Sequence, residues 1–146
     1  MLRTGLPTCK ALAARLVPAL ACIALVACYW SRYPEVMDTH LVVIAQFTRK
    51  VVALADDRRS VPIADWAEFV YPLGRARDFA RVAAQRFPER ASLASFDVVL
   101  ERYGELVDDP LILSRPDAAS LVRSRAAAVD AAIVTTREAL EKEEAG

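Results

Sequence analysis

The side chains best suited to chemistry in this 146-residue chain are few, and they lie far apart along it. His40 is the only histidine, and it falls on the apolar side of an expected helix, where an imidazole could act as a proton switch or a metal ligand. Arg125 falls on the apolar side of the last expected helix, where a guanidinium needs an acid or backbone carbonyls as partners, or binds something acidic. With Tyr103, these residues could contact a small ligand or a lipid in the core of a bundle. The plainer interpretation is that each is satisfied inside the fold.

Recognisable arrangements for catalysis or metal binding are absent from the sequence. It contains no glycine-rich phosphate loop, no recognisable Ser-His-Asp set and no Cys-x-x-Cys-His motif for haem. A zinc site would depend on carboxylates, because there is one histidine and no cysteine beyond Cys28. Asp97, Glu101 and Glu105 are spaced four apart, but they fall opposite the apolar residues of their helix, as a solvated face does. We therefore predict that the protein is not an enzyme and holds no metal or cofactor.

Cys28 ends an apolar segment that follows a cationic N-terminus. Three basic residues lie in the first 27 positions, and the first acidic residue is Glu35. The apolar residues 16–27 are fewer than the roughly 20 that a membrane-spanning helix needs. A cationic start, a short apolar segment and small residues before a cut are typical of a secretory signal. The alternative is an uncleaved single-pass anchor, which reaches that length only by including Arg15.

The four residues Leu25, Val26, Ala27 and Cys28 resemble the lipobox of bacterial lipoproteins. The resemblance implies cleavage before Cys28 and a thioether-linked lipid on its thiol. It also implies two or three acyl chains, and more than one is needed because a single chain binds a membrane only marginally. The two other cysteines would leave with the signal peptide. Tyr29 stands where inner-membrane lipoproteins of many Gram-negative bacteria have aspartate, so the resemblance points to the outer membrane, facing the periplasm. The inner membrane, with the domain outside, is the alternative.

This interpretation divides the chain into three parts. Residues 1–27 form a signal peptide, residues 28–33 a lipidated N-terminus and tether, and residues 34–146 a helical-bundle domain. Cleavage would leave 119 of the 146 residues, enough for one domain with its own core. Because the leader holds three of the 19 basic residues and none of the 19 acidic ones, the remainder has 16 basic and 19 acidic residues, a net charge of −3. This charge argues against a nucleic-acid partner.

Beyond the tether, apolar residues recur at helical spacing and nowhere alternate as they do in strands. The pattern predicts an all-α fold, an antiparallel bundle of about four helices after the N-terminal hydrophobic signal or anchor helix. The first helix is expected over about 34–57, and the second from about 62 to 87. The third is expected to end at about 108, and the fourth to begin near 114.

Local signals refine these boundaries. Pro72 predicts a kink or break in the second helix, because proline disfavours helix in the residue before it. Ser92 and Ser114 are expected to cap the third and fourth helices. Glutamates near the C-terminus, Glu143 among them, oppose the dipole of the last helix, so we expect this end to fray.

Leu111, Ile112 and Leu113 form an apolar triplet in the loop between the third and fourth helices. One interpretation is a docking loop for a partner protein. The other is structural, either a plug over the end of the bundle, which we favour, or a hydrophobic staple to the last helix.

These features together favour a small lipid-anchored helical bundle of the bacterial envelope. We expect it to act by binding or scaffolding, as an accessory to a larger envelope protein or complex. The alternative is a ligand- or lipid-binding bundle that uses His40, Tyr103 and Arg125.

Overall fold

The computed structural model describes residues 32–146, and all regular structure in this part of the chain is helical. Four α-helices and one short 3-10 helix follow one another there: α2 (Tyr33–Asp56), α3 (Ile63–Arg86), α4 (Ala91–Val107), η1 (Ile112–Ser114) and α5 (Ala118–Ala145). Residues Met37–Gly146 form one compact unit. The expected signal peptide and the lipobox-like residues 25–28 lie outside the described residues.

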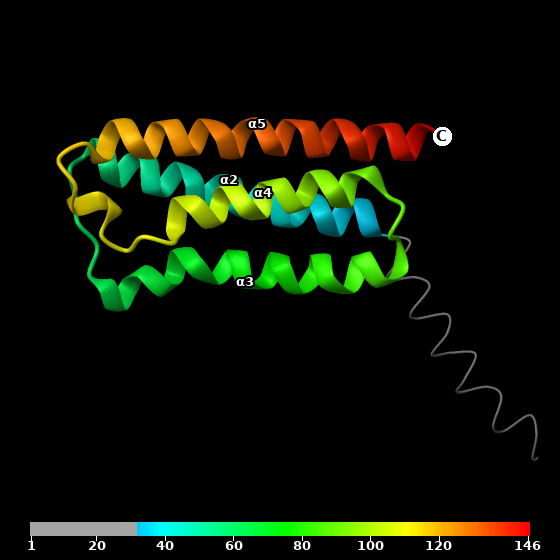
Figure 1. Cartoon of the computed structure of the whole chain (residues 1–146), viewed down its shortest axis with the longest axis horizontal. Helices are drawn as coiled ribbons and strands as arrows, with labels where there is room; N and C mark the ends of the chain where they lie inside the picture. Colours follow the sequence, from blue (N-terminus) through cyan, green and yellow to red (C-terminus); the bar gives the residue numbers. More distant parts are fainter. Residues whose placement is uncertain (1–31) are drawn as a thin grey trace, which may run out of the picture. The chain divides into compact units, whose positions relative to one another are not determined.

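Successive helices of this unit run in opposite directions (Figure 1). Two ion pairs give the register of α2 against α5, because Asp38 meets Arg137 at 2.9 Å and Asp56 meets Arg123 at 2.8 Å. Exposed pairs of this kind contribute at most about 1 kcal/mol each, so they report alignment more than stability. The expected all-α bundle is confirmed for the described residues.

The core is built from seams of buried residues that recur at spacings of three and four. The seam of α2 consists of Leu41, Ile44, Thr48, Val51 and Ala55. The seam of α5 consists of Val122, Ala126, Val129, Ile133, Thr136 and Leu140. Small residues in the α5 seam permit a close approach, and among the described elements α5 packs most extensively against α4.

Two threonines in these seams differ in how their hydroxyl groups are satisfied. Thr136 Oγ1 donates to the carbonyl of Ala132 at 2.9 Å, a common arrangement for threonine inside a helix. The hydroxyl of Thr48 is equally buried but has no hydrogen-bond partner among the described residues. Burying an unpaired polar group costs about 1–3 kcal/mol, so Thr48 is a weak point of the core.

A kink or a break was expected near Pro72; helix α3 is continuous there, so the break does not occur. Proline lacks the N–H that would donate to the carbonyl one turn earlier, which weakens the helix locally. Helix α4 holds α3 through two hydrogen bonds just before Pro72, however. Tyr103 Oη donates to the carbonyl of Phe69 at 2.7 Å, and Trp66 Nε1 donates to the carbonyl of Val107 at 2.8 Å. Tertiary packing therefore outweighs the local preference of proline to end the helix.

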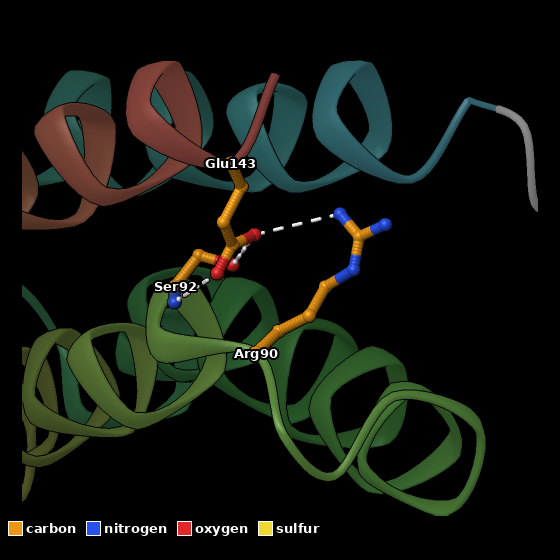
Figure 2. A network of polar contacts seen from close by, with 3 residues as sticks. All are labelled: Arg90, Ser92 and Glu143. Carbon is orange, nitrogen blue, oxygen red and sulfur yellow. Dashed lines mark hydrogen bonds and ion pairs between the residues drawn. The ribbon is translucent and has the colours of Figure 1, made fainter. Parts of the chain in front are cut away.

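The N-terminus of α4 is capped from a distant part of the chain. Ser92, the expected cap, lies inside the first turn, and Arg90 at the N-cap position makes no capping hydrogen bond with its side chain. Glu143 of α5 instead accepts hydrogen bonds from the N–H of Ser92 at 2.9 Å and from its hydroxyl at 2.8 Å (Figure 2). The fraying expected at the C-terminal end of α5 is not seen, since α5 is helical to Ala145. The Glu143 carboxylate opposes the dipole of its own helix but lies at the N-terminus of α4, where negative charge is stabilising.

The C-terminus of α4 is likewise satisfied by its neighbours. The last carbonyls of a helix have no N–H partner within the helix. Arg125 of α5 donates from Nη1 to the carbonyl of Glu105, and the Trp66 bond satisfies Val107. Helix α4 has no acidic residue in its first turn and no basic residue in its last, so both of its ends depend on α3 and α5.

Helix α2 ends in a Schellman motif. The N–H of Arg59 donates to the carbonyl of Leu54 at 2.9 Å, and the N–H of Arg58 donates to that of Ala55 at 3.2 Å. Arg58 adopts φ of 53°, in the left-handed region where glycine is favoured. This turn therefore stores strain that glycine would not have.

Helix α5 begins later than expected. Ser114 does not cap it but closes the short helix η1, and α5 starts at Ala118. The reason is that Ile112 and Leu113 are buried, which turns the chain inward before α5 can begin.

Candidate functional site

His40 lies half-buried against aromatic rings. Its ring centroid is 5.0 Å from that of Phe79 and 6.4 Å from that of Phe96. Burial lowers the pKa of His40 below its ordinary value of 6.5, and the positive charge of Arg75 lowers it further. Both effects favour the neutral imidazole, the form that packs well among rings.

Tyr103 and Arg125 are both engaged in bonds between helices. Tyr103 is fully buried, and its burial raises the pKa of the phenol well above its ordinary value, so it remains a hydrogen-bond donor to Phe69. Arg125 is half-buried, and the backbone carbonyl expected near it is that of Glu105.

The structure does not bring His40, Tyr103 and Arg125 together. Their partners belong to different parts of the bundle and none is shared. None of the three lines the groove between α3 and α4 that is described below.

The apolar triplet is only partly accessible. Ile112 is fully buried, Leu113 is almost so, and Leu111 is 54% exposed. A partner that docks at this loop would meet Leu111 and would not reach the other two side chains.

A groove of about 560 Å³, which we call the α3–α4 groove, lies between α3 and α4. Helix α3 contributes Ile63, Trp66, Ala67, Val70, Leu73 and Arg77. The other wall consists of Glu101, Gly104, Glu105, Val107, Asp108 and Pro110. The first wall is mainly apolar, whereas the second carries three carboxylates.

The helices position this groove through the contacts that hold them together. Trp66 and Leu73 are buried at its base, and the Trp66 bond to Val107 fixes the separation of the two walls. Gly104 leaves room beside α4 for Arg77, whose guanidinium would lie only 3.4 Å from a Cβ at that position. Leu111 follows Pro110 at the edge of the groove.

The groove has an excess of negative charge. Glu105 pairs with Arg102 at 3.0 Å, but Glu101 and Asp108 have no ion pair within residues 32–146. The single basic residue in the lining is Arg77. Such a surface favours cations or positively charged side chains over anions.

The acidic residues Asp97, Glu101 and Glu105 lie on the outside of the third helix as expected, but the groove beside them was not predicted. The sequence feature that would have indicated the groove is a second apolar stripe on α3, formed by Ile63, Ala67 and Val70 at helical spacing. These residues lie apart from the inward seam through Phe69 and Leu73, and a test for two apolar faces on one helix would have found them.

Residues 32–146 provide neither a metal-binding cluster nor a membrane-spanning helix. No group of three or more His, Cys, Asp or Glu side chains is arranged to hold a metal ion there. No helix in that range is both long enough and apolar enough to cross a membrane.

Comparisons of the chain with protein-family models, with curated proteins and with solved structures gave no match. Function must therefore be inferred from the residues and their geometry.

Proposed function

We propose that this protein is a lipid-anchored adaptor of the bacterial envelope, tethered through Cys28, which binds a partner protein with its helical bundle. The observation that carries the proposal is the lipobox-like sequence Leu25-Val26-Ala27-Cys28 behind a cationic, apolar leader. The α3–α4 groove supports the binding role, because it is a concave and partly apolar surface with charged edges.

The short tether would keep the bundle at the membrane. Five residue steps separate Cys28 from Tyr33, where α2 begins, and a fully extended chain covers at most about 3.6 Å per step. A lipid on Cys28 would therefore hold the bundle within roughly 20 Å of its attachment point. This arrangement suits a protein that acts on another component of the same membrane.

A lipid anchor is tested by the intact mass of protein extracted from the membrane. We expect a chain that begins at Cys28 and carries the added mass of two or three acyl chains. Cys28→Ala should abolish both the cut and the lipid, whereas Cys22→Ala, a matched change within the leader, should leave both unchanged. A full-length mass would instead establish the uncleaved single-pass anchor.

The choice of membrane is tested separately in a Gram-negative host. We expect the lipidated protein to fractionate with the outer membrane, and Tyr29→Asp to shift it to the inner membrane. If Tyr29→Asp does not change the fractionation, the outer-membrane assignment loses its basis.

The adaptor role is preferred over a ligand-binding core because of where the polar residues lie. A core ligand site would need at least two of His40, Tyr103 and Arg125 in one cavity. Tyr103 and Arg125 instead donate to backbone carbonyls of α3 and α4. A photo-crosslinker at Val70 in native membranes should capture a defined partner, and the same group at Val82, outside the groove, should not.

A further inference from the structure

Helix α3 presents apolar residues on two sides. Its inner side builds the core, and its outer side exposes Ile63 to 64% and Val70 to 41%, with Ala67 between them. Single exposed apolar residues are common and need no explanation. Here, however, they are aligned along one wall of a groove whose base contains Trp66 and Leu73.

The dimensions of this wall match a helix. From Ile63 to Arg77 the wall extends over 14 residue steps of α3, or about 21 Å at 1.5 Å per residue. A partner helix of about four turns has this length. Recognition of an amphipathic helix in an apolar groove is a common mode of binding, with anchor residues one turn apart.

The opposite wall specifies the charge of the partner. Glu101, Glu105 and Asp108 line it, and they lie in the last two turns of α4 or directly after it. Negative side chains near a helix C-terminus are locally unfavourable, because the dipole there is also negative. A positively charged partner would relieve this repulsion, whereas an acidic one would increase it.

We infer that the α3–α4 groove binds one amphipathic helix of a partner protein, with apolar anchors against Ile63 and Val70 and basic side chains against Glu101 and Asp108. This inference names the partner class of the proposed adaptor and rests on that function for its location in the envelope. The binding chemistry itself follows from the groove alone.

Two other occupants fit the charge less well. A second copy of the chain would bring two net-negative grooves face to face, which is repulsive. Anionic lipid headgroups carry the same sign as the groove and would be repelled as well. A basic helix satisfies the apolar wall and the acidic wall together.

The test uses the lipidated full chain in phosphatidylcholine nanodiscs and a fluorescent synthetic helix of about 16 residues. This probe carries leucines one turn apart on one face and lysines beside them. A second probe has glutamate in place of every lysine. Anisotropy titrations give both affinities, and Trp66 in a Trp30→Phe background reports directly on the base of the groove.

We expect the basic probe to bind and to change Trp66 fluorescence, and the acidic probe to bind at least about tenfold more weakly. Val70→Lys and Glu101→Lys should each weaken the basic probe by about tenfold or more. Val82→Lys and Asp97→Lys are the matched controls on the same helices outside the groove, and they should leave binding unchanged.

Several results would overturn the inference. Equal binding of the two probes, or equal loss in the control variants, would show that the groove does not select a basic helix. If the chain associates with itself and Val70→Lys abolishes this association, the groove binds a second copy. If the chain binds anionic vesicles and Val70→Lys abolishes this binding, the groove binds lipid. A Cys28→Ala chain in the same nanodiscs should still bind the basic probe, so failure of the groove and failure of the lipid anchor are distinguishable.

Discussion

Replacing Glu143 by alanine should destabilise the bundle, because this side chain joins the end of α5 to the start of α4 (Figure 2). Its two hydrogen bonds with Ser92 involve a charged acceptor, and such bonds contribute about 1.5–3 kcal/mol each. Holding a glutamate side chain in one conformation costs about 1.5–2 kcal/mol of entropy. The ion pair with Arg90, at 3.4 Å and one-third exposed, adds little. We therefore expect a net loss of about 1–4.5 kcal/mol.

Urea denaturation measures this loss as a lower transition midpoint at unchanged slope. Hydrogen exchange gives a local readout, because the amide of Ser92 should lose protection when its acceptor is removed. Glu144→Ala is the matched control, since this neighbouring glutamate is exposed and should change the stability by less than about 0.5 kcal/mol. If Glu143→Ala is no more destabilising than Glu144→Ala, or leaves the Ser92 amide protected, the capping role is refuted.

Four further changes test other features of the bundle. Thr48→Val should stabilise the bundle by about 1 kcal/mol in urea titrations, because the substitution removes an unpaired buried hydroxyl. Thr136→Val is the control, because it removes a hydroxyl that has a hydrogen-bond partner. An equal gain in stability from Thr136→Val would contradict this reason. Arg58→Gly should raise the free energy of unfolding by about 0.5–1 kcal/mol by relieving its left-handed conformation, whereas Arg58→Ala should not. Gly74→Ala should stabilise by about 1 kcal/mol, because a Cβ there meets nothing within 4 Å; a lower melting temperature would disprove that the site is open. Because burial lowers the pKa of His40, the unfolded chain binds the proton more readily and stability should fall as the pH drops below 6.5. His40→Gln should flatten this dependence of the unfolding midpoint, and an unchanged profile would exclude His40 as its source.

The proposed tether and the groove would together suit an adaptor that works close to a membrane. A lipid on Cys28 would confine the bundle to the bilayer surface, which raises its local concentration for a partner in the same membrane. A groove of modest affinity could then be sufficient. The substitutions proposed above to test stability lie outside the groove. They can therefore be combined with the peptide titrations without altering the binding surface.

Much of the fold could be predicted from the sequence because helix formation and burial follow local periodicity. Apolar residues at helical spacing predicted the four helices, and the buried seams of α2 and α5 follow that spacing. The cysteines, the cationic start and the lipobox-like residues 25–28 are also properties of the sequence itself, and they carry the proposed anchor.

The ends of the helices were decided by the tertiary structure. Helix α4 takes its N-terminal cap from Glu143, 51 residues beyond Ser92, and donors for its last carbonyls from Arg125 and Trp66. Packing likewise carried α3 through Pro72. A capping rule applied to the sequence considers only one helix and its dipole. In the folded protein, the capping group can be any correctly placed group on a neighbouring helix.

The candidate site depended on the tertiary structure for the same reason. Glu101 was expected on a solvated face, and Val70 lies two residues before Pro72, where a kink or break was expected. Only the antiparallel packing of α3 against α4 makes these two residues opposite walls of one groove. The sequence by itself determined which residues are apolar, acidic or reactive, and the packing of the helices determined which of them meet.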